Sequence, residues 1–277
     1  MNTKINLAGV ELKNPVMTAS GTFGSGMEYS EFVDLNKLGA VVTKGVANVP
    51  WPGNPTPRIA ETYGGMINAI GLQNPGIDVF CERDIPFLKK YDTKIIVNVC
   101  GKSERDYVEV VERLAGEPVD MLEINISCPN VKEGGIAFGQ NAANIEHITK
   151  AIKNVAKQPV IMKLSPNVTD ITEMAKAAEA GGADVLSLIN TITGMKIDIN
   201  RQTFAVANKT GGLSGPAVKP VAVRMVYQVA NAVKIPIIGM GGIATAEDAL
   251  EFILAGATAV SIGTANFHNP RTTLEVI

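Results

Sequence analysis

The sequence has few of the residues that hold metal ions or disulfide frameworks. It contains three cysteines and two histidines among 277 residues, and no two cysteines have the CxxC spacing. An odd number of scattered cysteines argues against a disulfide framework and favours a reducing compartment. Because an iron–sulfur cluster normally takes four thiolates, we expect neither such a cluster nor a zinc site within this chain. Electrons that leave the protein singly would therefore need another chain to carry them.

The chain also lacks an excess of charge and a long apolar segment. Its formal net charge is −2 and its pI is about 5.8, which leaves no basic surface for nucleic acid or an anionic membrane. Residues 1–13 lack the basic start and apolar core of a secretory signal. The stretch 252–267 is too short to span a bilayer and is interrupted by glycines and threonines. These absences predict a cytoplasmic protein with no nucleic-acid or membrane partner.

What the sequence does have is a regular alternation of short apolar runs and amphipathic helical patterns. Hydrophobic residues make up 46% of the chain, enough to bury a large core in one domain spanning residues 1–277. Eight strand–helix units favour a TIM (β/α)8 barrel, with a doubly wound open sheet as the second choice because it alternates in the same way. The predicted strands are Val16–Thr18, Ala40–Lys44, Lys94–Val99, Met121–Asn125, Val160–Leu164, Val185–Ile189, Ile237–Met240 and Ala259–Ile262.

Several segments depart from this regular repeat. Before the first strand, the pattern of Ile5–Leu12 predicts a small β-hairpin that closes the bottom of the barrel. Two unusually long connections, Gly45–Tyr63 and Asn190–Val218, follow strands, and the loop Pro129–Gln140 contains three glycines. Because the loops that follow the strands form the active-site face of a TIM barrel, we expect these three loops to have functional roles.

The segment Asn125–Asn130 places a single cysteine, Cys128, just past a buried strand. A cysteine can give or take a proton near neutrality, since its unperturbed pKa is about 8.5. The neighbouring carboxamides would orient a polar ligand without adding charge. A free cysteine is more commonly a small buried hydrophobic residue, however, and the segment alone leaves both interpretations open.

Polar residues and glycines stand at the ends of all eight predicted strands, which a barrel would bring to one mouth. Taken singly, each has an ordinary explanation as a surface lysine, a loop-capping asparagine or a turn glycine. Together they are harder to dismiss, because a buried polar group without a partner costs about 1–3 kcal/mol. These residues are Ser20-Gly21, Lys44-Gly45, Asn98, Asn125, Lys163, Asn190-Thr191, Gly241-Gly242 and Gly263-Thr264.

The last two glycine sites follow the seventh and eighth predicted strands, where TIM barrels often bind phosphate through backbone N–H groups. Lys44 and Lys163 would neutralise other parts of an anionic ligand, such as a carboxylate or a reduced flavin ring. The pattern therefore predicts a site for a phosphate-bearing cofactor and a small polar substrate.

Several motifs, in order along essentially the whole chain, resemble those of the class 1 dihydroorotate dehydrogenases. The cysteine loop Asn130–Gly135 and the opening Asn6–Pro15 are more similar to the 1B subclass than to the fumarate-using 1A subclass. The motifs are Thr43–Gly45, Asn68–Leu72, Asn125–Asn130, Ile189–Thr191, Gly211–Pro216 and Gly239–Ile243.

The resemblance implies one non-covalent FMN per chain, bound at the barrel mouth, and Cys128 as the catalytic base. The positions that match the family's flavin contacts are Ser20, Lys44, Gly45, Asn98, Asn125, Lys163, Ile189, Gly215, Gly241, Gly242, Gly263 and Thr264. The positions that match its substrate contacts are Lys44, Asn68, Ala69, Ile70, Gly71, Leu72, Asn125, Asn190 and Thr191.

The activity implied is oxidation of dihydroorotate to orotate in pyrimidine biosynthesis. Members of the 1B subclass pair with a subunit that carries FAD and a [2Fe–2S] cluster and passes electrons to NAD+. We therefore expect a heterotetramer of two catalytic and two electron-transfer subunits. Family members usually continue beyond the position of Ile277 with a further helical segment, so the last helix is expected to be incomplete.

Three alternatives to this function remain open. A dihydropyrimidine dehydrogenase-like reductase would share an FMN barrel and a catalytic cysteine. A flavin-free, phosphate-binding aldolase would use Lys163 as a Schiff-base nucleophile. A non-catalytic flavin-binding electron-transfer subunit would leave Cys128 with a structural role.

Overall fold

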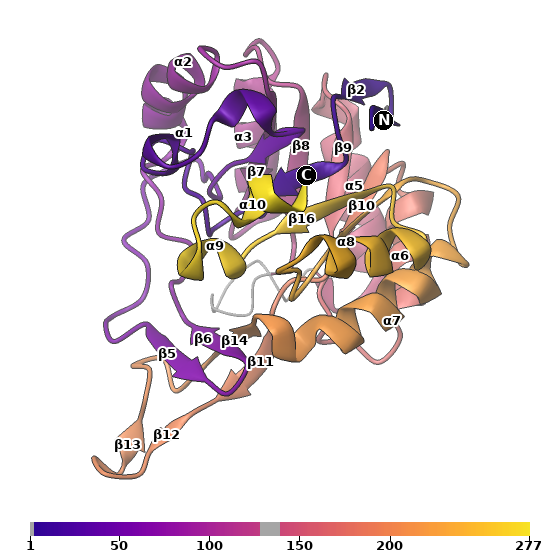
Figure 1. Cartoon of the computed structure of the whole chain (residues 1–277). Coiled ribbons are helices and arrows are strands. Elements are labelled where there is room, and N and C mark those ends of the chain that lie inside the picture. Colours follow the sequence, from indigo (N-terminus) through magenta and orange to yellow (C-terminus); the bar gives the residue numbers. More distant parts are fainter. Residues whose placement is uncertain (1–2, 128–138) are drawn as a thin grey trace.

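The computed structural model of the chain describes residues 3–127 and 139–277. Within these residues, eight parallel strands form a closed barrel (Figure 1), which confirms the TIM-barrel prediction over the open sheet. Closure is direct, since Val260 of the last strand pairs with Val16 of the first. The barrel strands are β3 (Val16–Thr18), β4 (Ala40–Val42), β7 (Lys94–Val99), β8 (Met121–Asn125), β9 (Val160–Lys163), β10 (Val185–Leu188), β15 (Ile237–Met240) and β16 (Ala259–Ile262).

The barrel strands are apolar along their length because both faces are covered. Alternate residues, such as Met17, Ile96 and Ile161, point into the barrel and form an inner cluster. Their neighbours, such as Val97 and Leu122, pack outward in a larger cluster that includes residues of the helices. The same alternation decides which polar side chains of each strand reach the barrel interior.

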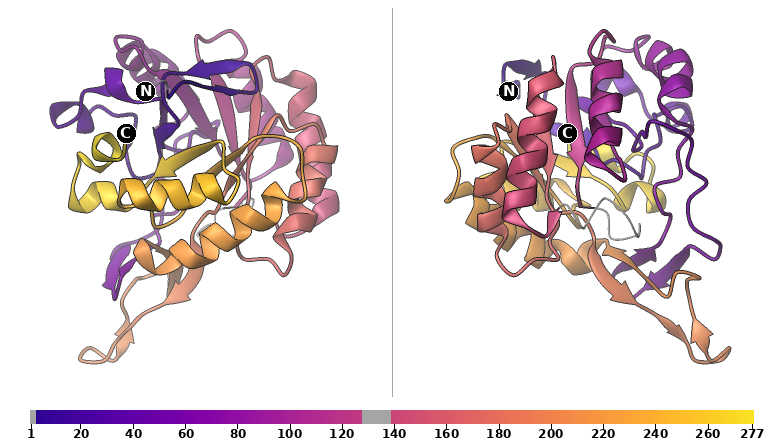
Figure 2. Two further views of the ribbon diagram at one scale, coloured as in Figure 1. Left: turned by 45° about the vertical axis from the view of Figure 1, so that its right-hand side comes forward. Right: turned by 180° about the vertical axis from the view of Figure 1, so that it is seen from behind.

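Helices cover the outside of the barrel (Figure 2). Stripes such as Ile145, Ile148 and Ile152 are buried against the strands, as their spacing predicts. No helix in the described ranges is long and apolar enough to cross a membrane. In the described residues the α-helices are α1 (Ile77–Val79), α2 (Ile85–Leu88), α3 (Glu104–Leu114), α5 (Ala142–Val155), α6 (Ile171–Ala180), α7 (Lys219–Ala230), α8 (Ala246–Leu254), α9 (Ala265–His268) and α10 (Thr272–Val276), with the π-helical segment η3 (Phe80–Asp84) and the 3₁₀ turns η1 (Tyr29–Glu31), η2 (Leu35–Lys37) and η4 (Pro216–Val218).

The N-terminal segment forms the predicted hairpin, from β1 (Ile5–Leu7) and β2 (Val10–Leu12). Leu7 and Leu12 are fully buried and pack with Met17 and Met121 at one end of the barrel interior. The hairpin therefore closes the bottom of the barrel.

A four-stranded antiparallel sheet lies in the described residues at the opposite end (Figure 1). It is built from the second long connection and from residues 59–68, at and just past the end of the first, with strand order β11-β14-β6-β5, and it pairs Leu213 with Ile67. We refer to it as the roof sheet. Its strands, and those of a smaller ladder that extends from it, are β5 (Ile59–Thr62), β6 (Gly65–Asn68), β11 (Ile192–Met195), β14 (Thr210–Ser214), β12 (Ile197–Asp198) and β13 (Thr203–Phe204).

The hairpin contribution to stability is testable with Leu7→Ala. Because Leu7 is fully buried, we expect the free energy of unfolding to fall by about 2–5 kcal/mol, from lost apolar burial and the cavity left behind. Urea unfolding followed by circular dichroism measures this change. The matched control is Leu254→Ala, because Leu254 is 86% exposed and should change stability by no more than about 0.5 kcal/mol. Equal effects of the two changes would contradict the role of the hairpin.

Candidate active site

A cavity of about 1130 Å³ opens at the carboxyl ends of the barrel strands, beneath the roof sheet. Its walls come from the residues that follow the strands and from the roof-sheet strands β5, β6 and β14. Every one of the predicted flavin-contact residues lines it. These are Ser20, Lys44, Gly45, Asn98, Asn125, Lys163, Ile189, Gly215, Gly241, Gly242, Gly263 and Thr264.

Eight of the nine predicted substrate contacts line the cavity. They are Lys44, Asn68, Ile70, Gly71, Leu72, Asn125, Asn190 and Thr191. Ala69 is not among the described lining residues. Its side chain is fully buried in a separate cluster with Ile67 and Val206, since neighbouring residues of an extended segment face opposite ways. Cys128 lies outside the described residues, as do residues 129–138 of the predicted glycine-containing loop.

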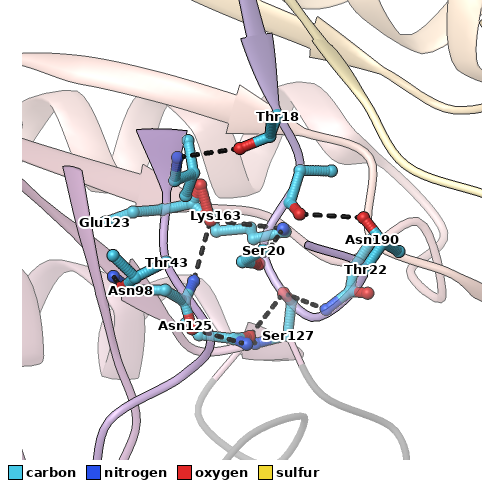
Figure 3. A network of polar contacts seen from close by, with 12 residues as sticks. Thr18, Ser20, Thr22, Thr43, Asn98, Glu123, Asn125, Ser127, Lys163 and Asn190 are labelled. Carbon is cyan, nitrogen blue, oxygen red and sulfur yellow. Dashed lines mark hydrogen bonds and ion pairs between the residues drawn. The ribbon is translucent and has the colours of Figure 1, made fainter. Parts of the chain in front are cut away.

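A buried ion pair lies at the base of this cavity (Figure 3). Lys163 on β9 and Glu123 on β8 are 4% and 1% exposed, and the Lys163 Nζ lies 3.2 Å from the Glu123 Oε1. Lys163 also donates to the Ser20 Oγ at 3.0 Å, and Glu123 accepts from the Asn98 Nδ2 at 2.8 Å. Each charge thus has the opposite charge and a hydrogen bond, which is what makes burial of both tolerable.

The amide groups continue from this ion pair toward the end of β8. The Asn125 Nδ2 donates to the Asn98 Oδ1 at 3.4 Å. The Asn125 Oδ1 accepts from the backbone N–H and the hydroxyl of Ser127, at 3.3 and 3.1 Å. The Ser127 Oγ in turn accepts from the Asn190 Nδ2 at 2.8 Å. These contacts join the residue before Cys128 to the loop after β10 (Figure 3).

The glycines at the mouth permit close backbone approach. Gly242 has φ +82°, and a Cβ there would lie 2.8 Å from the carbonyl oxygen of Gly215. In the loop after β16, the Thr264 hydroxyl donates to the Ser214 Oγ at 2.7 Å. The end of β14 therefore contacts both loops that the sequence predicts to bind phosphate. Gly241, Gly242 and Gly263 line the cavity and carry no side chain, which suits a phosphate cradle made of backbone N–H groups.

Glu123 and Ser127 belong to this network, although neither was predicted as a site residue. A signal for Glu123 was present in the sequence, because residues 121, 123 and 125 of one strand face the same side. A carboxylate two positions before Asn125 must then lie inside the barrel and needs a cation, which Lys163 supplies.

A family model described as dihydroorotate dehydrogenase matches residues 2–277. The chain belongs to the dihydroorotate dehydrogenase family. Among curated relatives, it is 78% identical over 277 residues to a protein of Lachnoclostridium phytofermentans named "Dihydroorotate dehydrogenase B (NAD(+)), catalytic subunit", covering 100% of this chain and 92% of the relative. A protein of the same name from Alkaliphilus metalliredigens is 69% identical, with the same coverage of both chains.

The fold comparison agrees with this family membership. The crystal structure of DHODH from Eimeria tenella in complex with ferulenol superposes with a TM-score of 0.83 at 25% sequence identity. The match covers 99% of this chain and 82% of that one. The family's barrel therefore extends through essentially all of the chain, as the order of the sequence motifs predicts.

The glycine loop after β15 is supported by a charged cluster. Asp248 accepts from the backbone N–H groups of Ala244 and Thr245 at 2.9 and 3.0 Å, and Lys219 binds it at 2.6 Å. Lys219 also binds Glu251 at 2.7 Å. Burial by itself raises the pKa of the Asp248 carboxyl, but the hydrogen bonds from Lys219 and the two amides outweigh burial and hold this pKa below its ordinary 3.8.

This lowered pKa predicts how stability depends on pH. A carboxyl whose pKa is lower in the folded state contributes stability that is fully present above its unfolded pKa and is lost as the pH falls through the folded value. We therefore expect Asp248→Asn to lose stability at neutral pH and to show a shallower loss than the native protein below pH 3.8. Urea unfolding at a series of pH values measures this, with the exposed Glu82→Gln as the control. An equally steep loss of stability below pH 3.8 in Asp248→Asn and in the native protein would contradict the lowered pKa of Asp248.

Proposed function

We propose that this chain oxidises dihydroorotate to orotate with a bound FMN, as the catalytic subunit of an NAD+-linked enzyme of pyrimidine biosynthesis. The observation that carries the proposal is the convergence of the predicted flavin and substrate residues on one cavity. The relative from Lachnoclostridium phytofermentans, 78% identical, has that activity in its name. We also propose that residues 1–277 form one domain and that the protein is cytoplasmic.

The cavity suits a cofactor and a substrate together. Its volume of about 1130 Å³ exceeds the roughly 300–1,000 Å³ usual for a single ligand pocket. The glycine loops at Gly241-Gly242 and Gly263-Thr264 would hold the phosphate of FMN, and Lys44 with the carboxamides of Asn68, Asn125 and Asn190 would hold the substrate.

The reaction removes a proton from C5 and a hydride from C6 of dihydroorotate, and a bound FMN would supply the hydride acceptor. Lys163, held by Glu123 and Ser20 at the base of the cavity, would stabilise the negative charge that reduction adds to a bound flavin. Lys44 would bind the substrate carboxylate. Cys128, which directly follows the anchored Ser127 in sequence, would take the C5 proton as general base.

The ion pair also bears on the aldolase alternative. A Schiff-base lysine must be neutral to act as a nucleophile. The Lys163 Nζ is instead held by the Glu123 carboxylate at 3.2 Å and the Ser20 Oγ at 3.0 Å, which ties it into an ion pair and does not present it as a free amine. A dihydropyrimidine dehydrogenase-like activity differs in its substrate, and Lys44 with the Asn68–Leu72 segment favours one that bears a carboxylate.

The experiment that tests the function is anaerobic mixing of the purified chain with dihydroorotate, following flavin absorbance. We expect rapid bleaching for the native protein and a rate lower by about 10²–10⁴-fold for Cys128→Ala, which lacks the base. The matched control is Cys81→Ala, because burial raises the pKa of the Cys81 thiol to about 11 and this residue lies in the outer core. A native protein without flavin, or one that dihydroorotate never reduces, contradicts the function. A fast Cys128→Ala variant contradicts only the role of the cysteine.

The proposed partner is a subunit that carries FAD and a [2Fe–2S] cluster and delivers electrons to NAD+. The words "catalytic subunit" in the names of the relatives support a second chain. With dihydroorotate, we expect this chain alone to reduce a dye acceptor and not NAD+. Adding the electron-transfer subunit of the same organism should give NAD+ reduction and a particle with the mass of two copies of each chain. Reduction of NAD+ by the isolated chain would contradict this assembly.

A further inference from the structure

Glu123 is the one charged residue of this network that the proposed mechanism does not bring into contact with a ligand. It is 1% exposed and is not among the described residues that line the cavity. Asn98 and Lys163, which it contacts directly, both line the cavity. A carboxylate in this position acts on ligands through other side chains.

The hydrogen bonds that lead to Glu123 all run in one direction (Figure 3). Asn190 donates to Ser127, Ser127 donates to Asn125, Asn125 donates to Asn98, and Asn98 donates to the Glu123 carboxylate. We call this series the amide chain. The Asn125 Oδ1 also accepts from the backbone N–H of Ser127 at 3.3 Å, and the Asn190 Oδ1 accepts from the backbone N–H of Thr191 at 2.8 Å, so the backbone orients these two amides. The Asn98 carboxamide instead lies between two side chains, Asn125 and Glu123. An ionised carboxylate only accepts, and a lysine ammonium only donates.

We propose that Glu123 is a positioning residue that fixes the Asn98 carboxamide at the end of the amide chain and the place of the Lys163 ammonium. The inference rests on the proposed function, since its readouts use flavin and orotate. Because the carboxylate accepts from the Asn98 Nδ2, the Asn98 Oδ1 is left to accept from the Asn125 Nδ2. The carboxylate thereby holds two groups that line the cavity, the Asn98 carboxamide and the Lys163 ammonium.

The test is Glu123→Gln, which keeps the shape of the side chain but removes the charge and adds a donor. A glutamine offers Asn98 and Lys163 only a neutral acceptor and adds a competing N–H donor, so neither cavity-lining group is held as in the native protein. The matched control is Asp84→Asn. Asp84 is also a buried carboxylate, 3% exposed and paired with Arg83 at 2.7 Å, but it does not line the cavity among the described residues.

The first readout is orotate binding, followed by the change in flavin absorbance on titration. We expect Glu123→Gln to weaken binding by at least about tenfold, as for a buried hydrogen-bonding group that loses its partner, and Asp84→Asn to stay within about twofold. Ser127→Ala, which interrupts the same chain, should weaken binding to a similar extent. The double variant should bind about as weakly as the weaker single variant, because both changes break one unit.

The second readout is the midpoint potential of the flavin, which a merely structural role would not move. Loss of the Glu123 charge leaves the Lys163 ammonium without its counter-ion and favours the anionic reduced flavin. We expect a shift of at least about tenfold toward the reduced form in Glu123→Gln, or about 30 mV upward for a two-electron couple. Ser127→Ala and Asp84→Asn should leave the potential unchanged, since neither alters this ion pair.

Three results overturn the inference. The first is orotate binding by Glu123→Gln within about twofold of the native affinity. The second is a flavin midpoint potential that is unchanged or lowered in this variant. The third is a double variant in which the losses of orotate affinity from the two single changes multiply. If Glu123→Gln does not fold, the test is orotate binding by Ser127→Ala. An orotate affinity equal to that of the native protein in this variant overturns the role of the amide chain. A native flavoprotein that fails to bind orotate contradicts the proposed function, and the inference with it.

Discussion

The buried ion pair between Lys163 and Glu123 is the interaction on which the rest of the site depends. Two charges inside a barrel are tolerable only with an excellent mutual geometry and further hydrogen bonds. Ser20 and Asn98 provide those bonds, so residues of β7, β8 and β9 and of the loop after β3 are held in one arrangement. The barrel is apolar below this level and polar above it. The ion pair marks the boundary, which is why the cavity begins there.

The barrel and the roof sheet contribute different things to this site. Lys163, Asn98 and Asn125 stand on barrel strands, whose packing on both faces restricts the movement of these residues. The roof sheet instead supplies Asn68 and the β14 end, which contacts both glycine loops. The barrel strands therefore position the charged and amide side chains of the site. The roof sheet, which comes from long connections that a simple TIM barrel lacks, encloses the cavity.

The sequence allowed the barrel to be predicted in detail. All eight strands lie where they were expected, with ends that differ by at most two residues, because strands covered on both faces leave unbroken apolar runs. The residues that line the mouth followed from their places after those strands. The roof sheet was not foreseen, since the pairing of Leu213 with Ile67 depends on barrel closure and not on local pattern. Glu123 was not predicted as a site residue because it lies within a predicted strand and not at its end, although strand alternation directs it inward.

The pairing of β6 with β14 has a consequence for the order of folding. These strands come from loops that follow the second and sixth barrel strands, so the ladder joins parts of the chain that are distant in sequence. Such contacts carry a large loop-closure entropy and form late, after more local strand–helix units have assembled. The enclosure of the cavity is then among the last parts of the molecule to form and among the first to open. A ligand that bridges the barrel and this sheet would stabilise the folded state by mass action and slow that opening.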